Sequence, residues 1–190
     1  KLVPLFPADM NHVFFCNSGS EAVDSAMKIA LQYHASRGEG GRNVFVSRDR
    51  AYHGVNIGGT SLSGLMKNRQ GFNAMVPGVV HMRSTFDPEQ RYSMGQPLLR
   101  GEELADDLLR IVQTHGAKSI AACFIEPIAG STGVLVPPVG YLERIRALCD
   151  EHEILMVMDE VLTGFGRTGA AFASDAFGVV PDILTMAKAL

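Results

Sequence analysis

The chain has 190 residues, of which 46% are hydrophobic and 19% charged, and its net charge is −3. This composition excludes a disordered chain, and the slightly acidic balance disfavours nucleic acid or an anionic membrane as a partner. The longest apolar runs are far shorter than the roughly 18 residues of a membrane span. The three cysteines, Cys16, Cys123 and Cys149, form no C-x-x-C pair, which favours reduced thiols in a cytoplasmic protein.

Strand-like runs alternate with helical patterns along the chain. A strand is predicted at residues 12–16, and a helix from Ser18 to about residue 36, because Ser18 and Glu21 have the spacing of a capping box. Strands are also predicted at 43–47, 119–125, 154–158 and 183–187, and helices at 102–114, 141–152 and 172–177. This alternation predicts an α/β fold, with a mostly parallel sheet covered by helices on both faces.

One long segment, residues 64–100, has weak periodicity and many Gly, Pro, Asn and Met residues. It is longer than an ordinary connection in a compact domain. We expect it to be an ordered excursion near an active site or a subunit interface.

Three small polar residues, Ser18, Gly19 and Ser20, stand where the first predicted helix begins. The first turn of a helix has unpaired N–H groups and a positive dipole end, and Gly19 allows a ligand to approach the backbone. The tripeptide therefore predicts a phosphate site. An ordinary capped helix would explain this stretch equally well.

Ligands of open α/β sheets bind at the carboxyl ends of the strands, so the polar residues at those ends are candidates for a site. Each one taken alone has a structural explanation as a core aromatic, a capping or ion-paired carboxylate, or a surface lysine. Five consecutive predicted strands deliver such residues: Ser18, Gly19 and Ser20, then Tyr52 and His53, then Glu126, Asp159 and Lys188.

Asp159 and Lys188 both end apolar runs. A buried carboxylate requires a cationic partner, and a desolvated lysine loses its proton readily and becomes a nucleophile. Together with a phosphate cradle and the ring of Tyr52, they predict a pyridoxal phosphate site. There the lysine forms the Schiff base, the carboxylate keeps the pyridine nitrogen protonated, and the aromatic ring stacks on the cofactor.

Five motifs then occur in order: "NSGSEAVDSAMKIA", "YHG", "EPIAGSTGV", "MDEVLTGFGRTG" and "PDILTMAK". Over nearly the whole chain the sequence resembles the class III (omega) aminotransferases, and within them the branch that uses omega-amino acids such as β-alanine with pyruvate. The resemblance implies the large domain of a fold-type I enzyme that works as a homodimer, with its active sites at the subunit interface.

The resemblance also implies a role for each matching residue. Gly19 and Ser20 would hold the phosphate with Ser18 beside them, and Tyr52 would stack on the ring. The remaining roles fall to residues further along the chain, with Asp159 pairing with the pyridinium, Val161 packing on the opposite face, Lys188 as the Schiff-base lysine, Glu126 near the ring oxygen and His53 behind these residues. No metal ligand set is predicted.

Residues 1–190 are expected to be part of the cofactor-binding large domain, with an N-terminal segment and a C-terminal small domain outside the chain. Relatives that use glutamate or 2-oxoglutarate often carry Gln and Glu where this sequence has Leu162 and Ser131. We therefore predict an aminotransferase that moves an amino group from an omega-amino acid or amine to pyruvate in a ping-pong cycle.

Two other interpretations remain open at this stage. An aminomutase or decarboxylase of the same family would share nearly every motif. A non-catalytic phosphate-binding α/β module belongs to a different class, but it has no need of Lys188, and the sequence contains neither G-x-G-x-x-G nor a Walker motif.

Overall fold

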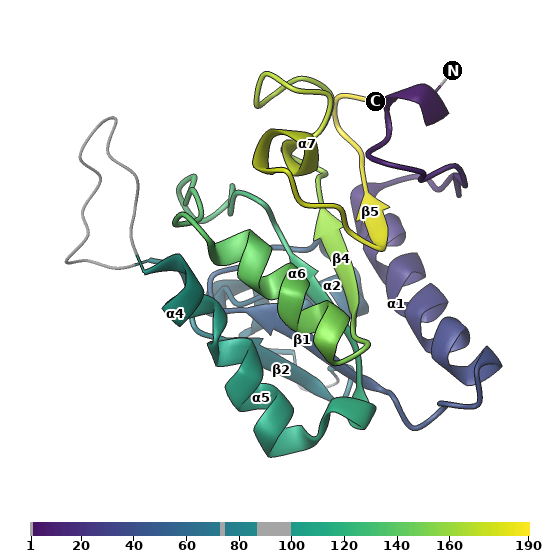
Figure 1. The fold of residues 1–190 in the computed structure, drawn as a ribbon, viewed down its shortest axis with the longest axis vertical. Helices are drawn as coiled ribbons and strands as arrows, with labels where there is room; N and C mark the ends of the chain where they lie inside the picture. The colour runs from purple at the N-terminus through teal and green to yellow at the C-terminus, as the bar shows by residue number, and fades with distance from the viewer. Residues whose placement is uncertain (1, 73–74, 87–99) are drawn as a thin grey trace.

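The computed structural model describes residues 2–72, 75–86 and 100–190. In these ranges one five-stranded sheet has the order β2-β1-β3-β4-β5, and all of its neighbouring strands are parallel (Figure 1). The strands are β1 (Val44–Arg48), β2 (Val79–Met82), β3 (Ile120–Ile125), β4 (Leu155–Asp159) and β5 (Ile183–Thr185).

Helices occupy the connections between the strands. The α-helices are α1 (Gly19–Ser36), α2 (Ile57–Leu62), α3 (Met66–Arg69), α4 (Gly101–Ala105), α5 (Asp107–His115), α6 (Tyr141–Glu151) and α7 (Ala173–Phe177). Short 3-10 helices lie at Val3–Leu5 and Ala117–Ser119.

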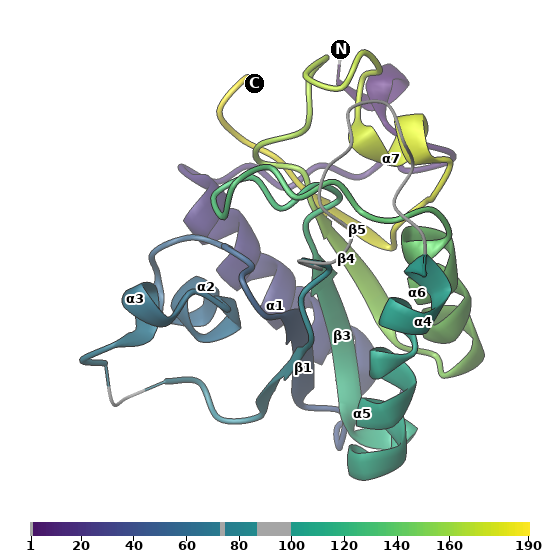
Figure 2. The ribbon, with the colours of Figure 1, turned by 90° about the vertical axis from the view of Figure 1, so that its left-hand side faces the viewer.

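Both faces of the sheet are covered, as Figure 2 shows. On one face, Phe124 of β3 packs in a core with Val23 of α1 and Leu62 of α2. On the other face, Ile125 packs in a second core with side chains of α4, α5 and α6. Every residue of β3 is buried, which explains its unbroken apolar sequence. The predicted fold class is confirmed.

Helix α1 begins where the capping pattern predicts. The side-chain oxygen of Ser18 accepts a hydrogen bond from the N–H of Glu21 at 3.2 Å. The Glu21 carboxylate reaches back and accepts from the N–H of Asn17 at 2.7 Å. Two N–H groups at the start of the helix region are thereby satisfied, and the chain direction into α1 is fixed.

The strand predicted at residues 12–16 is wrong. This segment runs in no regular structure and pairs with no strand in the described part of the chain. Phe14 and Phe15 are 69% and 72% exposed. A strand forms only where a neighbouring strand accepts and donates its backbone hydrogen bonds. An apolar sequence rich in β-forming residues favours the extended conformation but does not provide that neighbour.

Other predicted boundaries changed less. Strand β5 ends at Thr185 rather than at residue 187, and the helix predicted at 102–114 is two helices, α4 and α5, which meet at Asp106. The unperiodic segment 64–100 contains α3 and β2, neither of which was predicted. Its residues 73–74 and 87–99 lie outside the described residues.

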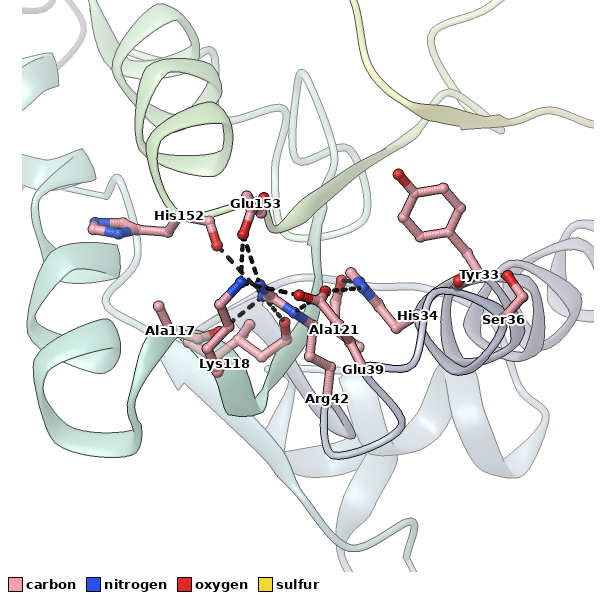
Figure 3. Close-up of polar contacts among 11 residues, drawn as sticks. Tyr33, His34, Ser36, Glu39, Arg42, Ala117, Lys118, Ala121, His152 and Glu153 are labelled. Atoms are coloured by element: carbon pink, nitrogen blue, oxygen red, sulfur yellow. Dashed lines mark hydrogen bonds and ion pairs between the residues drawn. The ribbon is translucent and has the colours of Figure 1, made fainter.

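A buried arginine joins three loops at the amino end of the sheet (Figure 3). Arg42 is 1% exposed. It donates to the carbonyl oxygens of Ala117 and Ile120 at 2.9 and 3.1 Å, and to the Glu39 carboxylate at 2.9 Å. Lys118 also contacts Glu39, at 3.0 Å. The network holds the loop after α1 against the start of β3, opposite the carboxyl ends of the strands.

This network predicts how stability depends on pH. The hydrogen bond from Lys118, with the charge of Arg42, lowers the pKa of Glu39 from 4.5 to about 2. A lowered carboxylate pKa stabilises the folded state above pH 4.5, and that contribution is lost as the pH falls to about 2. We expect Glu39→Gln to lower the urea midpoint of the complete protein near neutral pH, by a difference that shrinks across this window.

Glu143→Gln is the matched control, because Glu143 is an exposed carboxylate of α6 without an ion pair among the described residues. It should shift the midpoint little at any pH. A constant difference between Glu39→Gln and the unaltered protein from pH 4.5 to 2 would show that the loss is steric rather than electrostatic.

Candidate active site

A pocket of about 350 Å³ opens at the carboxyl ends of the strands. All nine residues predicted for the site line it, although they come from distant parts of the chain. They are Ser18, Gly19, Ser20, Tyr52, His53, Glu126, Asp159, Val161 and Lys188.

The strands contribute to this pocket differently from the prediction. Four strands, rather than five, lead into pocket residues: β1 into Tyr52, β3 into Glu126, β4 into Asp159 and β5 into Lys188. Ser18, Gly19 and Ser20 come instead from the start of α1, which no strand precedes among residues 2–18. The parallel direction of the strands brings these residues to the same edge.

The start of α1 packs tightly against two neighbouring loops. A Cβ atom on Gly19 would lie 2.9 Å from a methyl group of Val161. The hydroxyl oxygen of Ser20 accepts a hydrogen bond from the N–H of Val55 at 3.0 Å. Gly54, whose φ is +107°, leaves no room for a Cβ atom because it would lie 2.6 Å from that same oxygen. The hydroxyl proton of Ser20 remains available for an anion in the pocket.

Asp159 is 6% exposed and ends β4. One of its carboxylate oxygens lies 2.8 Å from Nδ1 of His53, and the other accepts from the N–H of Val161 at 3.1 Å. A buried carboxylate in this setting requires a donor, so the proton belongs on Nδ1 of His53. His53 itself is buried, and its Nε2 has no hydrogen-bond partner among the described residues.

Glu126 holds two loops in place. One carboxylate oxygen accepts from the N–H of Tyr52 at 2.9 Å, and the other accepts from the N–H of Gly130 at 3.1 Å. The buried guanidinium of Arg48 donates to the backbone carbonyl of Glu126 at 3.1 Å. Burial raises the pKa of Glu126, partly offset by the neighbouring His53. Glu126 therefore fixes the backbone of Tyr52 and, through it, the position from which the ring extends.

The environment of Lys188 is more exposed to solvent than the sequence predicts. Its side chain is exposed in this chain, whereas the sequence led us to expect a desolvated amine. The run before it does not bury it because β5 stops at Thr185, and Met186 and Ala187 are already only partly buried. The backbone of Lys188 has a φ of +58°, a conformation that costs about 1 kcal/mol or more for a residue with a side chain.

Sequence reasoning missed several residues around the pocket. Asn17, Gly54, Ser131, Leu162 and Ala187 also line it. For Ser131 and Leu162 the sequence indicates only a difference from relatives that use glutamate or 2-oxoglutarate. Motif spacing gave no signal for Gly54 beyond its place in "YHG".

Glu160, the residue after Asp159, was also missed. It is fully buried, and its two oxygens accept from the N–H groups of Ala173 and Ser174 at 2.6 and 2.7 Å. The Thr163 hydroxyl donates to it at 2.9 Å. Glu160 thus caps the start of α7 and fixes both ends of the loop that carries Val161 and Leu162.

Neither a metal-ligand cluster nor a membrane-spanning helix occurs in the described part of the chain. They contain no group of three or more His, Cys, Asp or Glu side chains arranged to hold a metal ion. No helix among them has the length and apolarity needed to cross a membrane.

Comparison with known proteins places the chain in a family. Residues 1–190 match the family described as aminotransferase class-III. The chain belongs to the class-III aminotransferases. It is 53% identical, over 191 residues, to an omega-aminotransferase of Caulobacter vibrioides, and 48% identical, over 188 residues, to omega-amino acid–pyruvate aminotransferase of Pseudomonas putida. The family resemblance read from the sequence is confirmed.

Solved structures agree with this assignment. The class-III aminotransferase chain superposes on the omega transaminase of Pseudomonas jessenii in complex with PMP with a TM-score of 0.90, at 37% identity. That match covers 98% of this chain and 41% of the other. The two curated relatives are covered over 43% and 42% of their length, with 100% and 99% of this chain included. The chain therefore has the fold of fold-type I transaminases and spans less than half the length of its relatives.

Glu160 offers a test of how the pocket loop is held. Glu160→Gln places an amide N–H₂ group where backbone N–H groups now donate, so at least one buried hydrogen bond to a charged acceptor is lost. We expect the free energy of unfolding, measured by urea titration of the complete protein, to fall by on the order of 3 kcal/mol. Glu151→Gln, an exposed carboxylate at the end of α6, should change it by less than about 0.5 kcal/mol. Equal losses in the two variants would contradict the capping role.

Proposed function

We propose that the complete protein is a pyridoxal-phosphate-dependent aminotransferase that moves an amino group from an omega-amino acid or amine to pyruvate. One observation carries the proposal. A single pocket combines a helix N-terminus, an aromatic ring, a buried carboxylate and a lysine, drawn from the start of α1, Tyr52, Asp159 and Lys188. The relative from Pseudomonas putida is named an omega-amino acid–pyruvate aminotransferase.

The residues present fit the cofactor. Its phosphate group requires backbone N–H groups and hydroxyls, which the first turn of α1 offers at Ser18, Gly19 and Ser20. Its pyridine nitrogen requires an anion, and Asp159 is a buried carboxylate that lines the same pocket. Its ring requires flat apolar surfaces, for which Tyr52 and Val161 are suited.

When bound, pyridoxal phosphate supplies an electron sink that stabilises negative charge on the substrate carbon. The protein's part begins with Asp159, whose negative charge keeps a proton on the ring nitrogen. His53, 2.8 Å from Asp159, keeps that carboxylate oriented by donating from Nδ1. The N–H of Val161 restrains the second oxygen, so the carboxylate does not rotate away.

Lys188 is proposed to hold the cofactor and then to move protons. Its amine Nζ is both nucleophilic and basic. When not bonded to the cofactor, Nζ would be placed to take a proton from the substrate carbon and return it. Lys188 follows β5 in the chain and lines the pocket.

The pocket wall favours a small acceptor. Leu162 is apolar, and Ser131 carries no charge. A dicarboxylate such as 2-oxoglutarate requires a second cation, which a carboxylate must mask while an omega-amine is bound. Neither side chain does this, whereas the methyl group of pyruvate requires only space.

The complete protein is further proposed to be a cytoplasmic homodimer. Support comes from large apolar side chains left exposed in this chain, among them Phe14, Phe15, Val55 and Ile57, since an exposed apolar patch marks an interface. An aminomutase or decarboxylase would use the same pocket residues and differ in its products. A non-catalytic phosphate-binding module would have no use for Lys188.

Lys188→Ala in the complete protein tests the chemistry. Loss of the amine removes both the covalent attachment and the proton carrier, so we expect the rate of transamination to fall by at least on the order of a thousandfold. Cofactor binding should persist weakly through α1 and Asp159. The measurement combines steady-state assays with the cofactor absorbance before and after borohydride treatment.

Lys28→Ala is the matched control, because Lys28 is an exposed lysine of α1 outside the pocket. It should keep the yellow colour and its reduction by borohydride. Near-normal turnover in Lys188→Ala would remove this residue from the mechanism, and a colourless unaltered protein would favour the binding module.

Acceptor choice is the second test. We expect kcat/KM for pyruvate to exceed that for 2-oxoglutarate by at least about tenfold, which corresponds to about 1.4 kcal/mol. The assay saturates the complete protein with β-alanine or a simple primary amine and compares both acceptors at low concentration. Equal use of 2-oxoglutarate would overturn the pyruvate assignment and leave the cofactor chemistry standing.

A further inference from the structure

Gly130 lies directly behind the pocket wall, in contact with Leu162. A Cβ atom on Gly130 would lie 1.7 Å from Cδ2 of Leu162 and 3.1 Å from its Cγ. The Leu162 side chain therefore occupies the space that any other residue at position 130 would fill. Leu162 and Ser131 both line the pocket.

The backbone of Gly130 is fixed by its own hydrogen bonds. Its N–H donates to Glu126 at 3.1 Å, and its carbonyl accepts from Gly133 and Val134 at 3.2 Å each. The loop thus has little freedom to retreat from an added methyl group. The end of the leucine side chain would have to move instead, and the open space beside it is the pocket.

We infer that Gly130 is a specificity-determining residue. Because it has no side chain, Leu162 can sit back against it, and the space that this leaves in the pocket sets the largest keto acid that the site accepts. The inference rests on the proposed aminotransferase function and deepens it. It assigns the width of the acceptor site to a residue that does not itself line the pocket.

The contrast between two acceptors tests it. Pyruvate and 2-oxobutyrate differ by one methylene group, a difference that a tight pocket discriminates by about 10- to 200-fold. In the complete protein, Gly130→Ala should lower kcat/KM for 2-oxobutyrate at least about tenfold more than for pyruvate, mainly through KM. The affinity for pyridoxal phosphate, from its absorbance, should change less than about threefold, which separates a narrowed acceptor site from a damaged cofactor site.

A second substitution supplies the decisive comparison. Adding Leu162→Ala to Gly130→Ala removes the displaced side chain and should return the ratio of the two kcat/KM values to at least that of the unaltered protein. Gly40→Ala is the control, because a Cβ atom on Gly40 would meet nothing within 4 Å. It should change neither ratio nor affinity.

Each outcome decides something. An unchanged acceptor ratio in Gly130→Ala, or a ratio that Leu162→Ala does not restore, overturns the inference. If Gly130→Ala does not fold, Leu162→Ala alone should raise the relative use of 2-oxobutyrate, and no rise overturns it equally. If the unaltered protein transfers no amino group to either acid, the proposed function is wrong and the inference falls with it.

Discussion

The buried carboxylate of Asp159 is the constraint on which the rest of the site depends. It ends a strand that is buried on both faces, where an anion is stable only with donors on its oxygens. His53 and the N–H of Val161 provide those donors. The loop after β1 and the loop after β4 are therefore held together by the same charge that the proposed chemistry uses.

Carboxylates form a framework around that charge. Glu126 binds N–H groups of two loops, at Tyr52 and Gly130, while Glu160 binds the start of α7. Backbone N–H groups in these loops have no partner from regular secondary structure, and each glutamate accepts hydrogen bonds from them. Such hydrogen bonds to a charged acceptor are stronger than those between neutral groups. Parallel strands bring the loops to one edge of the sheet, and these two glutamates determine how the loops lie there.

Local patterns in the sequence were sufficient for much of this arrangement. The unbroken apolar run of β3 and the Ser18 to Glu21 spacing depend on neighbouring residues alone, and both predictions are confirmed. The residues at strand ends followed from the parallel sheet. The contact of Gly130 with Leu162 joins positions far apart in the chain, and no periodicity encodes it. The exposure of Lys188 and the unpaired segment 12–16 depend on what lies beside them, which a pattern of residue types does not contain.

Glycines shape this pocket as much as larger residues do, because neighbouring side chains occupy the space beside them. Gly19 gives its space to Val161, Gly54 to Ser20 and Gly130 to Leu162. The first two pairs join the start of α1 to the loops after β4 and β1, and the third joins the loop after β3 to the loop after β4. In each contact one partner has no side chain. Such contacts leave little room for movement, because close-packed surroundings cannot accommodate even one added methyl group. The shape of the pocket is therefore set by these glycines together with Glu126 and Glu160, while the proposed chemistry belongs to Asp159 and Lys188.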